Sequence, residues 1–568
     1  MATKLHNLFK KEMSGRLFWV LVVLITLVKM GMTRFQMVYT WIDGAPLDDE
    51  LMFRAAQSIT SGQWLGAYDW LTLSKHMFFA VWLAVCHWLH LPYLAAGQLL
   101  ACGAALACCM AFAPVLRGYK QRLILFAVLA FSPAVTASFT LRVYRDNIFP
   151  ALCMLFFAGI CGYALRCRES LAKGLPWLLL AGVGLGTAWL TREDGMWLLP
   201  FALVGSLILL VTACIQQQSW MKKAVRCVVL LVPFAVLAAC IGAYSAMNYL
   251  YYGVFAVSDF SSGSFAAAVG AMSRVKADEW KPLASVPTDV RFKLYDAVDA
   301  LVPLEYWLEE EESLQNSFRN PELDDYQSGS FYWALRKAAW YEGVYDSAQK
   351  AQAYWQQVAD EINALCDAGQ LAANGPKRVG TTPPIRAEYI APVLVEGVKS
   401  FLYSLTFQDC APYDAVNRSI GLPEDLAVWE SYLGDTANDA AQAGTDLPYY
   451  SPIQKLVYTG MQAIQWLYAI GLPVAFVAAL VLQVRSGIQL LALHKQKAVQ
   501  PGQAMLWVLL LGLLAMALLR CFMIAFVEVA SFNIGTYVMY LSTVHPLLLL
   551  FSGAGILTQW RKNLWQKY

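Results

Sequence analysis

Residues 17–38 read LFWVLVVLITLVKMGMTRFQMV, and an acidic loop follows them directly. An apolar run of this length crosses the hydrocarbon core of a bilayer as a helix. The basic residues from Lys4 to Arg16 imitate the start of a signal peptide, but no small-x-small cleavage site closes the run. The stretch is therefore predicted as a retained first membrane span.

The composition of the whole chain agrees with that prediction. Of its 568 residues, 58% are hydrophobic and 14% are charged, and the mean hydropathy is +0.47. In soluble domains about a quarter of the residues are charged. The lower charged fraction and high hydrophobic fraction of this chain exclude a soluble enzyme, a disordered chain and a disulfide-stapled secreted scaffold. The sequence predicts an all-α polytopic membrane protein. The ten candidate spans are 17–38, 93–115, 122–140, 147–165, 175–191, 196–214, 226–249, 456–484, 503–528 and 536–558.

A shorter apolar run, residues 76–89, decides the orientation of every later span. If this run does not cross, the loops on one side of the membrane hold 19 basic residues and two acidic ones, Glu12 and Glu169. The positive-inside rule places that side in the cytoplasm. We therefore expect 76–89 to form an interfacial or re-entrant helix in the first outer loop, with both termini cytoplasmic. The basic residues are Lys4, Lys10, Lys11, Arg16, Arg117, Lys120, Arg122, Arg166, Arg168, Lys173, Lys222, Lys223, Arg226, Arg485, Lys495, Lys497, Arg561, Lys562 and Lys567.

This topology divides the chain into five segments. The large insert carries 29 acidic and 15 basic residues, a net charge of −14, and its mixture of Ala, Gln and Glu with spaced aromatic residues favours amphipathic helices. Its two cysteines, Cys366 and Cys410, form either a disulfide or two free thiols. The segments are a cytoplasmic tail (1–16), a transmembrane module with the outer loop 39–92 (17–249), the exoplasmic insert (250–455), C-terminal transmembrane helices (456–558) and a second cytoplasmic tail (559–568).

Three adjacent carboxylates, Asp48, Asp49 and Glu50, lie just outside the first span. Like charges this close raise the pKa of at least one of them unless a cation or metal compensates. Such a group can act as a general base on an acceptor hydroxyl or amine, or it can bind a hard divalent cation. The alternative is a solvated helix start, in which Asp48 or Asp49 caps the helix that begins near Leu51.

Cationic side chains recur on the same predicted outer side. Lys75 heads the interfacial helix, where it either holds a phosphate or extends to lipid headgroups. Arg520 lies deep in the ninth span, where an unpaired charge costs at least about 2.5–3.5 kcal/mol, so it binds a ligand or pairs with a buried carboxylate. Two short outer turns contain arginines, which are disfavoured on this side of the membrane. These arginines are expected to pair with a lipid-linked phosphate or with the neighbouring acidic residues. The two turns contain Arg142, Arg145 and Asp146, and Arg192, Glu193 and Asp194.

Together these features resemble the GT-C glycosyltransferase superfamily, polytopic enzymes that use polyprenyl-phosphate-linked sugars. Its members include protein O-mannosyltransferases and the aminoarabinose transferases that modify lipid A. The acidic pair after the first span is similar, and Ala55-Ala56 with Ser61-Gly62-Gln63-Trp64 resembles the family's A…G-D-W stretch. Lys75 stands where the family has a Lys-Pro-Pro helix, and residues 540–546, YLSTVHP, resemble the R-Y-L-x-P-x-x-P opening of a late span. No prolines follow Lys75, and Met539 replaces the late-span arginine.

The resemblance implies a GT-C-like bundle with inverting transfer of a sugar from a polyprenyl-phosphate donor. Asp48 or Asp49 would be the catalytic base. No metal site is assigned and no cofactor is certain, although a divalent cation fits. The partners would be the donor, membrane lipids and a protein, lipid or glycan acceptor, with no nucleic acid. The donor phosphate would be held by Lys75, Arg145, Arg192 and Arg520, with further acidic contacts from Glu50, Asp146, Glu193 and Asp194.

Two other functions stay open. A transporter or flippase for a lipid-linked sugar predicts charges inside several spans, broken helices and an inverted repeat. The ninth span holds one arginine, Arg520, and one glutamate, Glu528, and the sequence has no repeat. A catalytically inactive GT-C-like scaffold agrees with the missing proline and arginine motifs. The short cytoplasmic loops favour a bacterial inner membrane, with residues 250–455 periplasmic or extracellular.

Overall fold

A computed structural model describes residues 12–559, apart from 43, 45, 117, 217–218, 261, 415–416, 440–450, 497, 499, 534 and 536. Most of the two predicted tails, 1–16 and 559–568, and the basic residue Arg117 lie outside the described residues. The described chain is almost entirely helical. Its strands are β1 (Arg319–Asn320) and β2 (Asp325–Tyr326), a short antiparallel pair with Arg319 opposite Tyr326.

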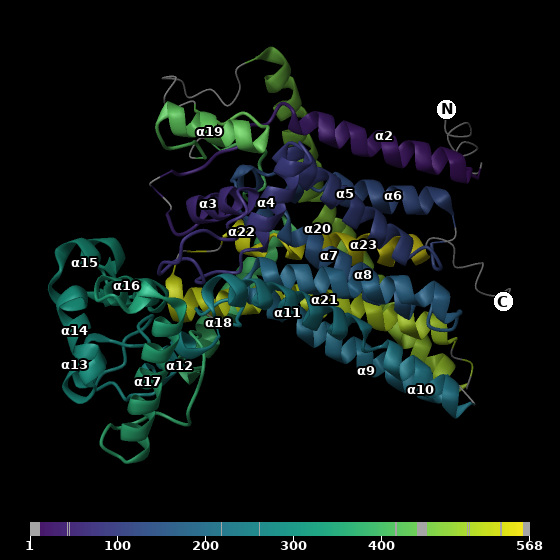
Figure 1. The fold of residues 1–568 in the computed structure, drawn as a ribbon. Coiled ribbons are helices and arrows are strands. Elements are labelled where there is room, and N and C mark those ends of the chain that lie inside the picture. Colours follow the sequence, from purple (N-terminus) through teal and green to yellow (C-terminus); the bar gives the residue numbers. More distant parts are fainter. Residues whose placement is uncertain are drawn as a thin grey trace.

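Eight helical stretches of the described chain are long and apolar enough to cross a membrane. They confirm the predicted all-α polytopic fold, and Figure 1 shows most of them running side by side as one bundle. Their helices are α2 (Gly15–Thr33), α5 (Tyr93–Ala111), α7 (Phe149–Ala164), α8 (Leu171–Thr191), α9 (Leu199–Gln216), α10 (Trp220–Val229) continued by α11 (Val232–Tyr252), α20 (Pro452–Lys495) and α21 (Pro501–Val527).

The two remaining predicted spans are not single long helices. In the span predicted at 122–140, α6 (Tyr119–Ala130) ends before Pro133, and short 3-10 turns continue the chain at an angle of 51°. Proline has no N–H to donate, and it disfavours helical geometry at the residue before it. The last predicted span is divided into α22 (Val538–Leu541) and the 16-residue α23 (Val544–Gln559).

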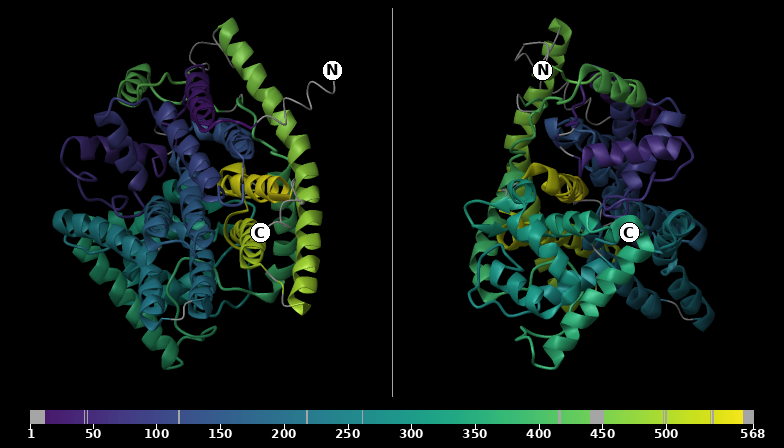
Figure 2. Two further views of the ribbon diagram at one scale, coloured as in Figure 1. Left: turned by 90° about the vertical axis from the view of Figure 1, so that its right-hand side faces the viewer. Right: turned by 60° about the vertical axis from the view of Figure 1, so that its left-hand side comes forward.

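Small residues bring the central helices of the bundle into close contact. A Cβ atom added to Gly159 of α7 would lie 2.4 Å from the backbone nitrogen of Ala181 in α8. A Cβ atom on Gly184 of α8 would lie 2.4 Å from the backbone nitrogen of Phe156. Glycine at these positions lets the two backbones approach, as in other membrane helix pairs. The longest helix, α20, runs along the edge of the bundle (Figure 2).

The first loop folds at the end of the bundle opposite the two ends of the chain (Figure 1). It contains α3 (Asp49–Thr60) and α4 (Phe78–Trp88), and the 11 residues of α4 are too few to cross a bilayer. Before α3 the chain is extended and forms single bridges from Tyr39 to Arg142 and from Trp41 to Ile420. These bridges place Arg142 beside the start of α3.

The insert is helical, as predicted, and its buried residues belong to two different cores. Residues from Phe265 to Cys366 form a core of their own, which Trp70 of the first loop joins. Tyr403, Phe407 and Trp429 belong instead to the main core of the bundle. Cys366 and Cys410 are both free, so the disulfide alternative is wrong. The helices are α12 (Ser264–Met272), α13 (Thr288–Ala297), α14 (Val302–Glu305), α15 (Glu312–Phe318), α16 (Ser328–Tyr341), α17 (Ala348–Asp367), α18 (Ile390–Leu405) and α19 (Pro423–Leu433).

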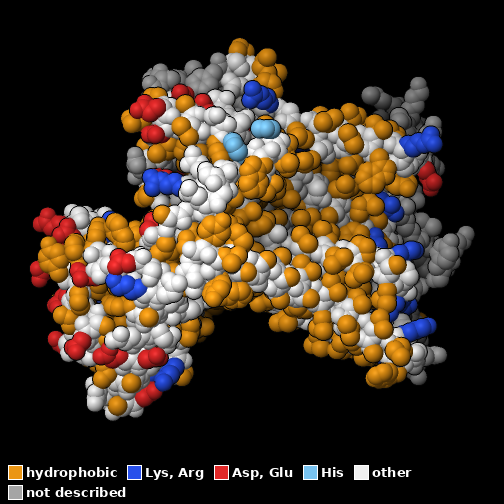
Figure 3. Space-filling view, in the orientation of Figure 1, with side chains coloured by type: hydrophobic (Ala, Val, Ile, Leu, Met, Phe, Trp, Pro, Cys, Tyr) orange, Lys and Arg blue, Asp and Glu red, His pale blue; other side chains and the backbone are white. Residues whose placement is uncertain are grey.

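The surface charges are separated along the molecule. Figure 3 shows hydrophobic side chains over the sides of the bundle, Lys and Arg at the end where the described chain begins and ends, and Asp and Glu gathered on the lobe formed by α12 to α17. An apolar belt between basic and acidic ends is the pattern that a membrane protein with basic cytoplasmic loops requires. Together with the eight apolar helices, this surface identifies an integral membrane protein.

Candidate functional site

The acidic stretch after the first span begins a network of buried charges. Asp48 directly precedes α3, and its side chain makes no capping hydrogen bond to that helix. Its Oδ1 atom instead pairs with Lys75 Nζ and accepts a hydrogen bond from Tyr144 Oη at 2.9 Å. Burial disfavours the Asp48 carboxylate, but Lys75 and Arg142 outweigh this effect and hold the pKa of Asp48 below its usual value. A cation therefore compensates the crowded carboxylates, and the capping interpretation of Asp48 is wrong.

Asp49 has a different environment from its neighbour. Its side chain is 0% exposed, whereas that of Asp48 is 37% exposed. Arg142 binds Asp49 with two hydrogen bonds, Nη2 to Oδ1 at 2.5 Å and Nε to Oδ2 at 3.1 Å. The backbone N–H of Trp41 also donates to Oδ2, at 3.2 Å. Asp49 is thus fully engaged in holding the loop, while Asp48 keeps an accessible carboxylate.

Tyr144 connects the first pair of charges to a second pair. Its hydroxyl accepts hydrogen bonds from Lys75 Nζ at 3.3 Å and from Arg145 Nη2 at 2.7 Å. Arg145 Nη1 also donates to both carboxylate oxygens of Glu193, at 2.8 and 3.0 Å. The backbone N–H of His76 donates to the same glutamate at 2.9 Å. One chain of contacts therefore joins the first loop to the turns before α7 and α9.

A third set of charges continues the site toward α21. Arg192 Nη1 donates to Asp146 at 2.9 Å, and Arg192 Nε donates to Asp194 at 3.0 Å. Arg520 Nη2 pairs with the same Asp194 at 2.7 Å, and its Nε donates to the carbonyl oxygen of Tyr540 at 3.1 Å. The side chain of Arg520 is 1% exposed. Arg520 is therefore paired with a carboxylate, that of Asp194, which is 24% exposed. Pairing with a carboxylate was one of the two alternatives that its sequence position left open.

Three buried polar atoms of this network have no hydrogen-bond partner among the described residues. Two are donors on guanidinium groups, Arg145 Nε and Arg520 Nη1, and the third is an acceptor, Asp146 Oδ2. A buried polar atom without a partner costs about 1–3 kcal/mol, and more when it carries charge. The network therefore has donors left to bind an anion after its own carboxylates are paired.

The structure brings together nine of the ten predicted site residues. The exception is Glu50, which pairs with Arg54 one turn later in α3. Arg142 also belongs to the network although no role was predicted for it, and Tyr144 and Tyr540 were not predicted. The position of Arg142 three residues before Arg145, in a loop where arginine is disfavoured, was the available signal. The nine residues are Asp48, Asp49, Lys75, Arg145, Asp146, Arg192, Glu193, Asp194 and Arg520.

The charge balance of the site bears on metal binding. Among the described residues, no group of three or more His, Cys, Asp and Glu side chains is arranged to hold a metal ion. Each carboxylate of the network lies against a lysine or an arginine, so its charge is already compensated. The arrangement is suited to an anionic ligand at the guanidinium donors and to a proton acceptor at Asp48.

Comparisons with known proteins add little to this geometry. No protein-family model and no curated protein matches the chain. Among solved structures, it is similar to the crystal structure of ArnT from Cupriavidus metallidurans in the apo state, with 13% sequence identity and a TM-score of 0.29. The match covers 96% of this chain and 78% of that one. A likeness at this TM-score transfers no residue roles to this chain.

Proposed function

We propose that the protein is a membrane glycosyltransferase of the GT-C type, which moves a sugar from a polyprenyl-phosphate donor to an acceptor at the outer face of the membrane. The observation that carries the proposal is the combination of two features in one network. Arg145 and Arg520 have buried donors without partners, and Asp48 has a carboxylate that is partly accessible. The free guanidinium donors can stabilise the charge on a phosphate leaving group. The accessible carboxylate can accept the proton of the nucleophile.

The cationic side chains would stabilise the lipid phosphate as it leaves. Negative charge develops on that phosphate while the bond to the anomeric carbon breaks, and fixed donors in a buried site stabilise it strongly. Arg145 Nε and Arg520 Nη1 are the donors available for this role. Arg192 lies between them and would hold Asp146 and Asp194 in place. Lys75 would contribute a positive charge at the side of Asp48.

Asp48, and not Asp49, would receive the proton of the acceptor. Because the pKa of Asp48 is held low, the group is ionised at neutral pH and is a weak base before the reaction. Proton transfer would therefore accompany formation of the new bond to the anomeric carbon, on the face opposite the leaving phosphate. Asp49 would act as a positioning residue through Arg142.

The proposed orientation follows from the charge separation. Asp48 directly precedes α3 and Lys75 shortly precedes α4, and these helices lie at the end of the bundle away from its basic end (Figures 1 and 3). If the basic end is cytoplasmic, the donor sugar is transferred at the outer leaflet. A bacterial inner membrane agrees with this orientation, and it would place the acidic lobe in the periplasm.

The test is thermal unfolding of the purified chain with and without polyprenyl phosphate and polyprenyl-phosphate sugars. A ligand at 100 times its Kd stabilises the folded state by about 2.7 kcal/mol. We expect this stabilisation in the wild type and in Asp48→Asn, and its loss in Arg145→Gln and Arg520→Gln. The matched control is Arg291→Gln, which removes a buried arginine that pairs with Asp325 and Glu309 in the acidic lobe.

The outcomes separate the competing functions. If no polyprenyl phosphate stabilises the wild type, the glycosyltransferase proposal is wrong. If stabilisation occurs but the wild type consumes no donor, a transporter or an inactive scaffold describes the protein better. If Asp48→Asn consumes donor at the wild-type rate, Asp48 is not the base. A loss of stabilisation in Arg291→Gln as well would mean that the arginine variants act through the fold and not through the phosphate.

A further inference from the structure

Helix α18 exposes a stripe of large apolar side chains although it belongs to the acidic insert. Ile390, Leu394, Val398 and Leu402 recur every four residues, so they lie on one side of the helix. With the adjacent Val395, they are between 53% and 69% exposed. Soluble proteins rarely expose a continuous apolar patch of this kind, and such a patch marks contact with a membrane or another protein.

The opposite side of α18 packs on a membrane-crossing helix. A Cβ atom on Gly397 would lie 2.3 Å from the ring of Phe522 in α21. Nearer the acidic lobe, the ring of Tyr389 lies 6.1 Å from that of Phe526. Between these two contacts the numbering of α18 rises while that of α21 falls. The two helices therefore run in opposite directions, and α18 leads the chain inward from the outer end of α21.

The inner part of α18 reaches the level of two other helices of the bundle. The ring of Phe401 lies 5.5 Å from that of Phe476 in α20, and Phe476 lies 5.7 Å from Phe551 in α23. Phe551 is seven residues past the start of α23, about 10 Å along its axis. The inner end of α18 thus lies well below the outer ends of these helices.

The chain then turns and leaves the bundle. Phe407 and Asp409 have positive φ angles of 50° and 54°, which reverse its direction. The ring of Phe407 lies 4.8 Å from that of His545, near the outer end of α23. Further along, the carbonyl oxygen of Ala411 accepts a hydrogen bond from the backbone N–H of Ser138 at 2.8 Å. The path from α18 to Ala411 therefore enters the bundle and returns on the same side.

We infer that α18 and the turn after it form a re-entrant segment in the outer leaflet, whose apolar stripe contacts phospholipid acyl chains. The stripe continues the exposed apolar side of α20, where Val474 and Val477 are 68% and 59% exposed. A helix satisfies its own backbone hydrogen bonds, so it can lie in hydrocarbon without further partners. This inference does not depend on the proposed glycosyltransferase function.

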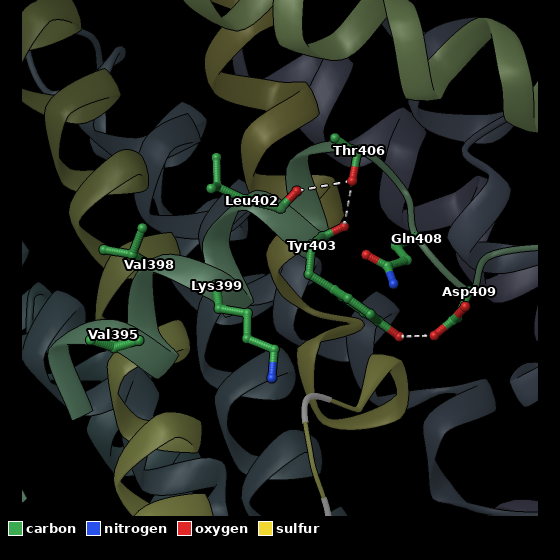
Figure 4. Close-up of a pocket in the computed structure, with 8 residues that line it drawn as sticks. All are labelled: Val395, Val398, Lys399, Leu402, Tyr403, Thr406, Gln408 and Asp409. Carbon is green, nitrogen blue, oxygen red and sulfur yellow. Dashed lines mark hydrogen bonds between the residues drawn. The ribbon is translucent and has the colours of Figure 1, made fainter. Parts of the chain in front are cut away.

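A groove at the inner end of α18 fits the same occupant. It has a volume of about 510 Å³, and Val395, Val398 and Leu402 form its apolar side (Figure 4). Lys399 and Tyr403 lie along it, and Tyr403 Oη donates to Asp409 Oδ2 at 2.7 Å. An acyl chain would lie against the apolar side. The long stem of Lys399 would carry its ammonium, which also pairs with Glu396 at 3.2 Å, toward the headgroup phosphate.

The test is photo-crosslinking of the full-length protein in vesicles of phosphatidylethanolamine and phosphatidylglycerol. The crosslinker p-benzoylphenylalanine replaces Val398 in one variant. It replaces Val477 in a reference variant on α20 and Phe292, which is 44% exposed on α13 of the acidic lobe, in a second reference. Intact-mass spectrometry after irradiation measures phospholipid adducts, and thermal unfolding shows that each variant is folded.

We expect Val398 to give phospholipid adducts in a yield comparable with that of Val477, while Phe292 gives none. A yield at Val398 like that at Phe292 would overturn the inference, because the stripe would then face water. A crosslinked species of twice the mass of the chain would overturn it too, since a second copy of the protein would then cover the stripe. The Val477 variant ensures that a negative result at Val398 is meaningful.

Discussion

The two adjacent aspartates at the start of α3 should respond differently to the same substitution, Asp49 mainly in stability and Asp48 mainly in activity. Asp49→Asn replaces two carboxylate acceptors with one amide oxygen, so one of the two hydrogen bonds from Arg142 faces an NH₂ group instead. Breaking a buried ion pair by removing one partner costs about 3–5 kcal/mol. Arg142 keeps Asp48 at 3.6 Å, which compensates part of the loss. We therefore expect a cost at the lower end, about 3 kcal/mol.

Asp48→Asn should have a much smaller effect on stability. Both hydrogen bonds to this carboxylate, from Lys75 and Tyr144, reach the same oxygen, and an asparagine can present its amide oxygen there. The Asp48 side chain is also 37% exposed, so water can compensate part of the lost negative charge beside Lys75, which is itself 9% exposed. The substitution should instead remove most of the activity, because it removes the proton acceptor.

Urea unfolding in detergent, followed by tryptophan fluorescence, measures both effects. A double-mutant cycle of Asp49→Asn with Arg142→Gln isolates the pair, and the double variant should lose less stability than the two single variants together. The reasoning would be refuted if Asp49→Asn cost less than Asp48→Asn, or if the cycle showed no coupling. Either result would mean that the buried pair does not hold the loop.

Three further predictions concern other parts of the molecule. Gly159→Ala should destabilise the protein by about 1–3 kcal/mol through overpacking between α7 and α8, while Gly242→Ala, whose Cβ meets nothing within 4 Å, should not; thermal unfolding compares them. Burial, opposed by a backbone hydrogen bond, raises the pKa of Asp435 to about 6. The folded state then binds a proton that the unfolded state has lost, so stability should fall as the pH rises from about 4 to 6, and Asp435→Asn should flatten this dependence in unfolding measured from pH 4 to 7. Arg520→Met should lower the stability less than Arg192→Met. Arg192 pairs with both Asp146 and Asp194, whereas Arg520 pairs, among the described carboxylates, only with Asp194, which keeps Arg192 as a partner when Arg520 is removed. The midpoints of urea unfolding measure this order.

The membrane fold was predictable because two strong signals coincide in the sequence. Apolar runs of bilayer length marked the spans, and the excess of Lys and Arg on one side gave a consistent alternation of loops. Pro133 could be read from the sequence as a possible interruption of the span 122–140, but the bend of 51° that it accompanies could not. The position of α18 was not predictable, since its 16 residues are short for a span and lie within an acidic region.

The site was predictable residue by residue but not as a network. Arg145 in an outer turn and Arg520 within a span could be recognised as site residues, because an unpaired charge at such a position is energetically costly. Their partners depend on contacts between segments far apart in the chain, as between Arg520 and Asp194. The division of roles between Asp48 and Asp49 depends on burial, which adjacent residues in a loop do not reveal in sequence. Tyr144 joins the two halves of the network and carries no charge that could have marked it.

The most direct test of the central claim is donor consumption by the purified protein in lipid nanodiscs. The wild type and Asp48→Asn are incubated with polyprenyl-phosphate sugars and membrane extract as a source of acceptors, and release of polyprenyl phosphate is followed by mass spectrometry. We predict release by the wild type and a decrease of about 10²–10⁴-fold in Asp48→Asn, the usual contribution of a general base. Equal release by both proteins, or none by the wild type with any donor, would contradict the account.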